Sequence, residues 1–153
     1  MIQKAFDAVT RGSKSKQYWL TPPELYADLE AEFHFDFDPC PFPREGFDGL
    51  RSDWGSCSYV NAPFSKVDGK SFCAWEYKAV EEWKKGKTIV LLKPQNTSEH
   101  ALWECKPEIR CLGRIPWVAT DGSGERQKSR NYIAVILRAS LSQKQSDIKD
   151  GDK

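Results

Sequence analysis

Apolar residues recur with two different periods along this chain, and the periods predict where helices and strands form. Leu25, Leu29 and Phe33 stand four residues apart, which gives one apolar stripe and predicts an amphipathic helix that ends at Phe33. The stretch 21–24 has the form of a capping box with proline at the first helical position, so Thr21 is the expected N-cap. The first firm element therefore begins at Thr21.

A second helix and several strands follow from the same reasoning. Large apolar residues at helical spacing predict a helix over 71–85 that buries one face and ends at Gly86. The run 88–92 is apolar almost throughout, which is typical of a central strand buried on both faces. Alternation and short apolar runs predict the remaining strands, and a further helix is expected near 98–105. The other predicted strands are 33–37, 58–60, 109–112, 113–118 and 131–137.

Helices and strands alternate in this order, which predicts an α/β fold, and 153 residues suffice for one domain with one core. Residues 1–16 are small, polar and basic, and we expect them to form a flexible arm. All the predicted elements lie within 17–138, which we take as the folded domain. From 139 to 153 the residues Ser, Gln, Lys and Asp dominate, which predicts a disordered tail.

The composition excludes several classes of protein. A formal net charge of +1 means that any basic, nucleic-acid-binding surface has to be local. No long apolar run is present, and the N-terminal segment lacks the apolar core of a signal peptide, so we expect no membrane segment and a cytoplasmic location. The cysteines form no Cys-x-x-Cys pair, and the histidines are not at ligand spacing from them, so no metal site is predicted.

The most unusual stretch is 58–65, where a β-prone run breaks into Asn61-Ala62-Pro63-Phe64. Pro63 has no N–H and cannot continue a central strand. Asn61 offers both a carbonyl acceptor and an NH₂ donor, and Phe64 offers an aromatic face for stacking. Such a group suits the binding of a flat, hydrogen-bonding ring, although a plain exit from strand to loop explains the same four residues.

These four residues resemble the Asn/Asp-Pro-Pro-Tyr/Phe motif of amino-methyltransferases, which methylate an exocyclic or amide nitrogen with S-adenosylmethionine. Ala62 stands where the motif has its first proline. The resemblance implies that Asn61, a backbone carbonyl at Ala62 or Pro63, and the ring of Phe64 hold the target base. The base has to leave the duplex to reach them.

Two further stretches resemble cofactor motifs. Thr21 and Pro22 open a helix as in the Thr-Pro-x-x-Leu element of DNA adenine methyltransferases, where the threonine end touches the methionine part of the cofactor. The stretch 38–40 follows a predicted strand and resembles the Asp-Pro-x-Cys/Ala-Gly-x-Gly motif, but no Gly-x-Gly follows it here. Asp53 precedes the next strand and is placed to accept the adenine amino group of a cofactor, although a turn role explains it equally well. The candidate cofactor-binding residues are Trp19, Thr21, Pro22, Asp38, Pro39, Cys40 and Asp53.

In their order, these motifs resemble the phage-type Dam-like DNA N6-adenine methyltransferases over about residues 18–137. The resemblance implies a compact, shortened Rossmann-like methyltransferase sheet with helices on both faces and a C-terminal antiparallel hairpin. It also implies S-adenosylmethionine as cofactor and double-stranded DNA as partner. The source it implies is a phage, with action in the cytoplasm of the bacterial host and a role connected with restriction and modification.

Candidate DNA contacts are basic residues in segments that we expect to lie outside the core. The loop predicted at 119–130 is long for a hairpin, and long loops in compact domains are often functional. A mobile, solvated loop is the alternative. The candidate DNA-binding residues are Lys14, Lys16, Lys66, Arg126, Lys128 and Arg130.

Two other functions stay open at this point. The first is a methyltransferase that acts on a protein glutamine or an RNA base, because the turn at Asn61 suits any planar amide or amine. The second is a non-catalytic DNA-binding module, in which a methyltransferase fold has lost its cofactor. The missing Gly-x-Gly favours the second.

Overall fold

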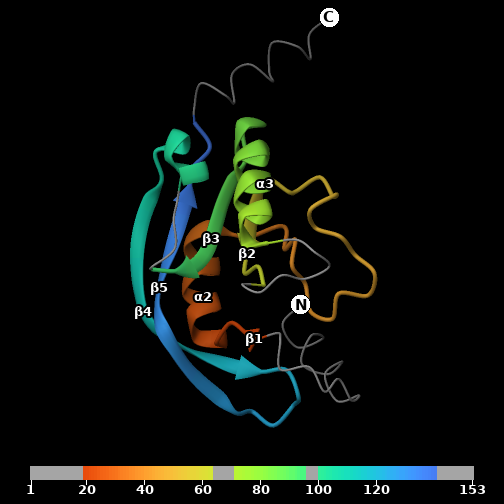
Figure 1. The fold of residues 1–153 in the computed structure, drawn as a ribbon, viewed down its shortest axis with the longest axis vertical. Coiled ribbons are helices and arrows are strands. Elements are labelled where there is room, and N and C mark those ends of the chain that lie inside the picture. The colour runs from red at the N-terminus through yellow and green to blue at the C-terminus, as the bar shows by residue number, and fades with distance from the viewer. Residues whose placement is uncertain (1–18, 64–70, 96–99, 141–153) are drawn as a thin grey trace, which may run out of the picture.

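The computed structural model describes residues 19–63, 71–95 and 100–140 (Figure 1). Within these stretches, five strands form one sheet in the order β1-β4-β5-β3-β2. None of the described helices is long and apolar enough to cross a bilayer. The elements are β1 (Trp19–Leu20), α2 (Pro23–Phe33), β2 (Cys57–Val60), α3 (Phe72–Lys84), β3 (Thr88–Pro94), the 3₁₀ helix η2 (His100–Cys105), β4 (Glu108–Ala119) and β5 (Arg126–Leu137).

The apolar run 88–92 forms the inner strand β3, as predicted, and its side chains show how the two α-helices are placed. The four residues from Ile89 to Leu92 are fully buried. Ile89 and Leu91 belong to one apolar cluster with residues of α3, whereas Val90 and Leu92 belong to a second cluster with residues of α2. Because side chains alternate across a strand, α2 and α3 cover opposite faces of the sheet (Figure 1). The α/β class is therefore confirmed.

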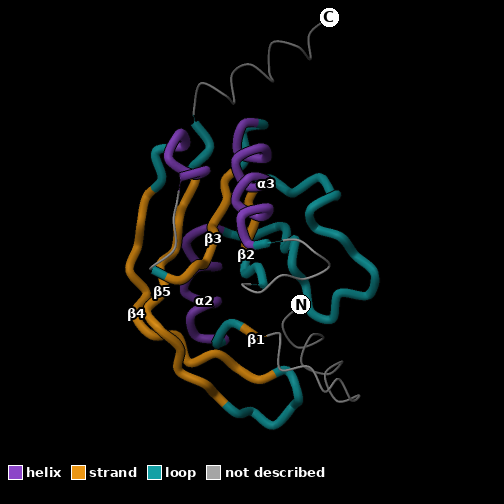
Figure 2. Tube along the Cα trace, viewed as in Figure 1, coloured by secondary structure: helices purple, strands orange, loops and turns teal. Residues whose placement is uncertain are grey.

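The sheet is mixed. Strand β2 pairs with β3 in parallel, whereas the pairings β3–β5, β5–β4 and β4–β1 are antiparallel. A curled mixed sheet with two α-helices is what the described residues form, and the Rossmann-like arrangement stays a prediction (Figure 2).

The strand predicted over 33–37 is mostly absent. Helix α2 continues through Phe33 and ends at His34, whose backbone is left-handed with φ of 53°. Only Phe37 pairs with a strand: it forms a parallel bridge with Ser58, on the side of β2 away from β3. The Asp36 N–H donates to the carbonyl of Cys57 at 3.0 Å, which fixes the start of this short pairing.

The C-terminal antiparallel hairpin is confirmed, but its predicted boundaries were wrong. The two strands expected over 109–112 and 113–118 are one strand, β4, bent by a bulge at Gly113, which has φ of 71°. The long loop expected over 119–130 is reduced to 120–125, because β5 begins at Arg126 and pairs with Val118. Arg126, Gln127 and Lys128 pair with Val118, Trp117 and Pro116, and the buried rings of Trp117 and Tyr132 pack with centroids 5.0 Å apart.

Candidate active site

The carboxyl ends of adjacent parallel strands meet at one edge of the sheet. The segment at Phe37 forms a parallel bridge with β2, and β2 pairs in parallel with β3. Asp38 directly follows the first of these segments, and Asn61 directly follows the second. In open α/β sheets, ligands bind outside this edge. The structure thus brings two of the predicted site residues, Asp38 and Asn61, to the same edge of the sheet.

Asn61 is half-buried and is held through its amide nitrogen. Its Nδ2 donates to the carbonyl of Trp19 at 3.3 Å and to Oγ1 of Thr21 at 3.4 Å. Among the described residues, none donates a hydrogen bond to Oδ1 of Asn61. The side chain therefore has a fixed donor end and an acceptor that is available to a ligand.

Thr21 has a different role from the predicted one. The N-cap of α2 is Pro22, no side chain caps the helix, and Glu24 instead pairs with Arg126 of β5, so the predicted capping box was wrong. The Thr21 hydroxyl forms a short hydrogen bond with the hydroxyl of Tyr59 and also accepts from Asn61. Thr21 thus joins the start of α2 to the end of β2.

Tyr59 is a site residue that the motifs did not indicate. It is 4% exposed, and burial strongly raises the pKa of its phenol, with a smaller contribution from the nearby Asp38 carboxylate, so the hydroxyl stays protonated. The rings of Tyr26 and Phe35 lie 5.0 and 5.2 Å from its ring and hold it in place. In the sequence, only the alternation of side chains along the strand indicates where Tyr59 lies, because it puts Tyr59 on the face of the sheet opposite to that of Val60.

Asp38 is a carboxyl group in a polar turn. Its Oδ1 accepts a hydrogen bond from the N–H of Cys40 at 2.8 Å. The side chain is reached by solvent, but the protein around it desolvates the carboxylate and raises its pKa to about 6, against the smaller lowering by the Cys40 N–H. Burial and the neighbouring Asp38 also raise the pKa of the Cys40 thiol well above its usual value, so Cys40 is not a thiolate nucleophile at neutral pH.

The backbone of Gly49 packs closely against the backbone of this turn at Pro39. A Cβ at position 49 would stand 1.9 Å from the carbonyl oxygen of Pro39, so only glycine fits there without moving the chain. No Gly-x-Gly follows Cys40 in the sequence, and the close backbone approach near this turn is the one between Gly49 and Pro39.

Gly49→Ala is therefore expected to lower the melting temperature, because Pro39 and with it Asp38 have to shift. The control is Gly46→Ala, where nothing lies within 4 Å of the new Cβ and the only cost is the backbone strain at φ of 79°. Thermal melting of both variants gives the comparison. A wild-type melting temperature in Gly49→Ala would show that this contact does not hold the turn.

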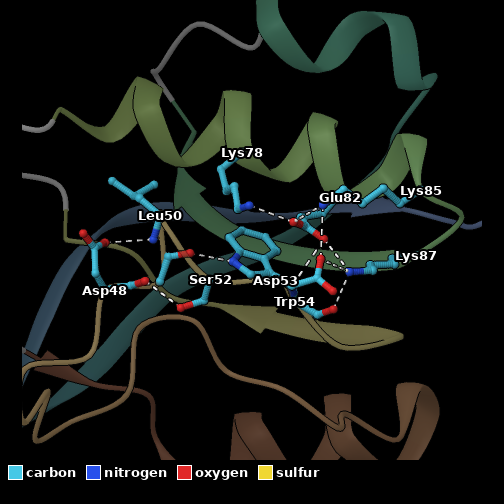
Figure 3. A network of polar contacts seen from close by, with 10 residues as sticks. Asp48, Leu50, Ser52, Asp53, Trp54, Lys78, Glu82, Lys85 and Lys87 are labelled. Carbon is cyan, nitrogen blue, oxygen red and sulfur yellow. Dashed lines mark hydrogen bonds and ion pairs between the residues drawn. The ribbon is translucent and has the colours of Figure 1, made fainter.

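Asp53 lies at the other end of the strands. It pairs with Lys85 at 3.1 Å and Lys87 at 3.0 Å, just before β3 begins, and hydrogen bonds from Lys87 and Lys85 lower its pKa to about 2 (Figure 3). The buried carboxylate of Glu82 joins the same network and contacts both lysines. The structure does not bring Asp53 to the edge where Asp38 and Asn61 lie, so we leave it out of the proposed site.

The remaining predicted residues divide into those that the structure describes and those outside the described stretches. Ala62 is buried and Pro63 half-buried directly after Asn61. Pro22 and Pro39 are buried beside Thr21 and Asp38. Within the three described stretches, no group of His, Cys, Asp and Glu gathers as a metal site. Lys14, Lys16, Phe64 and Lys66 lie outside the described residues, as do most residues of the predicted arm and tail and the side chain of Lys128.

Comparison with known proteins adds one finding. The family model described as DNA N-6-adenine-methyltransferase (Dam) matches residues 9–149, which is nearly the whole chain. The searches of curated proteins and of solved structures found no match.

Proposed function

Because the chain belongs to the DNA N-6-adenine-methyltransferase (Dam) family, we propose that it methylates N6 of adenine in DNA with S-adenosylmethionine as cofactor. The observation that carries the proposal is the arrangement at Asn61. Its amide nitrogen is bound to Trp19 and Thr21, and its Oδ1 is available at the edge of the sheet that also holds Asp38.

Asn61 matches what the reaction requires. The N6 amine of adenine is a poor nucleophile because its lone pair is delocalised into the ring. A fixed acceptor that takes a hydrogen bond from the amine helps to localise this lone pair, and fixed dipoles do so without reorganising. We assign this role to Asn61 Oδ1 and to a backbone carbonyl at Ala62 or Pro63, and no charged base is needed.

The residues around Asp38 fit the proposed cofactor. S-adenosylmethionine, when bound, supplies an electrophilic methyl group and carries two positive charges, on its sulfonium and its ammonium. Asp38 is a solvent-exposed carboxyl whose pKa is raised by desolvation from the surrounding protein, and no described cation pairs with it. Trp19 and Thr21 lie on the Asn61 side of the site and complete the candidate cofactor residues. Asp38 thus favours a cationic group at this edge.

The experiment that tests the proposal uses the purified protein, a DNA duplex and methyl-labelled cofactor, with N6-methyladenine measured by mass spectrometry. An RNA of the same sequence and a glutamine-containing peptide serve as alternative substrates, and label in either of them alone would favour the second kind of methyltransferase. A thermal shift with S-adenosylhomocysteine separates the enzyme from the non-catalytic DNA-binding module, because only a ligand that binds the folded state raises the melting temperature.

DNA binding is proposed for the basic residues of β5, which now belong to a strand and not to a long loop. Arg126 pairs with Glu24 at the start of α2, and Arg126 and Arg130 are exposed. This places at least part of the basic surface on the same side of the sheet as α2 and Thr21. The hairpin therefore remains the described segment best suited to contact phosphates.

Replacing Arg126, Lys128 and Arg130 by Gln is expected to reduce the slope of log K against log salt by about 2.7, since each of the three lost phosphate contacts removes about 0.9. Fluorescence anisotropy with a labelled duplex at several salt concentrations measures the slope. The control replaces three lysines at the α3–η2 end of the molecule, and a hairpin variant that keeps the wild-type slope would refute the contact. These control lysines are Lys84, Lys85 and Lys106.

A further inference from the structure

A buried ion pair joins the end of β3 to α3. Nζ of Lys93 lies 2.7 Å from Oε1 of Glu76, and the two side chains are 0% and 4% exposed. The Lys93 ammonium also lies 5.7 Å from the centre of the Phe72 ring, at the start of α3. Burying two charges has a large desolvation cost, and well-packed apolar residues in the same place are often as stabilising or more so. Stability alone therefore does not explain this pair.

The pair stands level with the turn that carries Asn61. Val60, the last residue of β2, is the register partner of Leu91 in β3; Ala62 follows Val60 by two residues, past the end of β2, and Lys93 follows Leu91 by two residues within β3. Ala62 is 2% exposed and belongs to the apolar cluster on the α3 side. Asn61, one residue earlier, points to the other side and contacts Thr21. The turn is thus held between α2 on one side and α3 on the other.

We propose that Lys93 and Glu76 are positioning residues that hold α3 against the turn 61–63 and thereby fix the direction of Asn61 Oδ1. The assignment rests on the proposed methyltransferase function. Ala62 is the residue of the turn that packs on the α3 side, and Pro63 directly after it restricts the backbone of both residues. A short, directional ion pair fixes the distance between β3 and α3 more sharply than apolar packing does, and it does so beside this residue. Displacements of about 1 Å in a reacting group reduce rates by up to about a hundredfold.

The test replaces the pair by apolar residues of similar size in Lys93→Met/Glu76→Leu. The expected result is a melting temperature equal to or above that of the wild type, unchanged affinity for S-adenosylhomocysteine and DNA, and a single-turnover methylation rate lower by roughly tenfold to a hundredfold. A second variant, Glu76→Gln, keeps an acceptor oxygen for Lys93 and is expected to fold with a smaller loss of rate.

The matched control is Glu82→Gln, which weakens a buried carboxylate–lysine contact at the far end of the same helix (Figure 3). It is expected to lower the melting temperature and leave the single-turnover rate of folded protein unchanged. A folded Lys93→Met/Glu76→Leu protein with the wild-type rate would overturn the assignment, and so would failure of both pair variants to fold. An inactive wild-type protein would instead contradict the proposed function, and the assignment with it.

Discussion

Asn61→Ala is expected to lower the single-turnover rate of adenine methylation by about a hundredfold to a thousandfold, the usual effect of removing one oriented group that stabilises a transition state. The side chain has an available Oδ1, while its Nδ2 is bound to Trp19 and Thr21. If Oδ1 acts mainly as the methyl group is transferred, affinity for DNA and cofactor should change little. Rapid-quench assays with a duplex substrate measure the rate.

Two variants separate this role from a structural one. Asn61→Asp keeps an acceptor oxygen and is expected to retain more activity than Asn61→Ala. Thr21→Val removes the hydroxyl that binds Asn61 and Tyr59 but leaves Oδ1 in place, so it should lower the melting temperature by a few degrees with a smaller loss of rate. If Asn61 only ties β2 to the start of α2, Asn61→Ala will instead melt a few degrees lower and methylate at the wild-type rate.

Asp38→Asn is expected to abolish measurable cofactor binding and, at the same time, to raise the melting temperature at pH 7.5. The pKa of Asp38 is about 6 in the folded protein against an ordinary value of 3.8, so the folded state holds this proton more tightly than the unfolded state does. The contribution of Asp38 to stability is therefore greatest below pH 3.8 and is lost as the pH rises through 6. The neutral amide removes this loss at neutral pH.

The measurement is a set of melting curves from pH 4.5 to 8, with calorimetric titration of S-adenosylhomocysteine. At pH 4.5 the carboxyl is protonated in the folded protein but mostly ionised in the unfolded chain, so the two melting temperatures should differ less than at pH 7.5 without becoming equal. Wild-type cofactor affinity should itself decline below about pH 6. The control is Asp36→Asn, which weakens hydrogen bonds to the N–H groups of Ser56 and Cys57 and should destabilise the protein at pH 7.5. An unchanged affinity in Asp38→Asn would remove this residue from the cofactor site.

Local sequence patterns predicted most of the elements, since α2, α3 and β3 depend on apolar periods that are visible in a short window. Patterns failed where a distant partner decides the structure. The predicted strand at 33–37 is reduced to one bridge because Phe33 completes α2 and Phe37 finds its partner in Ser58. Most of the second half of the predicted loop at 119–130 becomes strand because residues of 126–128 find register partners in 116–118 of β4.

The same limit applies to the candidate site. Trp19 and Thr21 were chosen from one motif and Asn61 from another, and the structure joins all three by hydrogen bonds. The position of Asp53 before a strand predicted a cofactor contact. Its carboxylate instead accepts hydrogen bonds from lysines more than 30 residues later in the chain, which no local pattern reveals. In the sequence, Lys93 only marks the end of an apolar run. Its partner Glu76 lies on a helix whose exposed and buried faces both contain Glu, so the sequence does not show that the two residues pair.

The sheet order sets the moment during synthesis at which the site becomes complete. Strand β1, whose Trp19 carbonyl holds Asn61, pairs with β4 at Ala119 and Val118, and β4 is joined to the rest of the sheet through β5. A ribosome-bound chain that has released only residues up to about 105 already contains Asn61, Asp38 and both helices, yet it lacks the two strands that anchor β1. Activity should therefore emerge late on the ribosome, when the hairpin leaves the exit tunnel, and non-local pairing of this kind is slow to form.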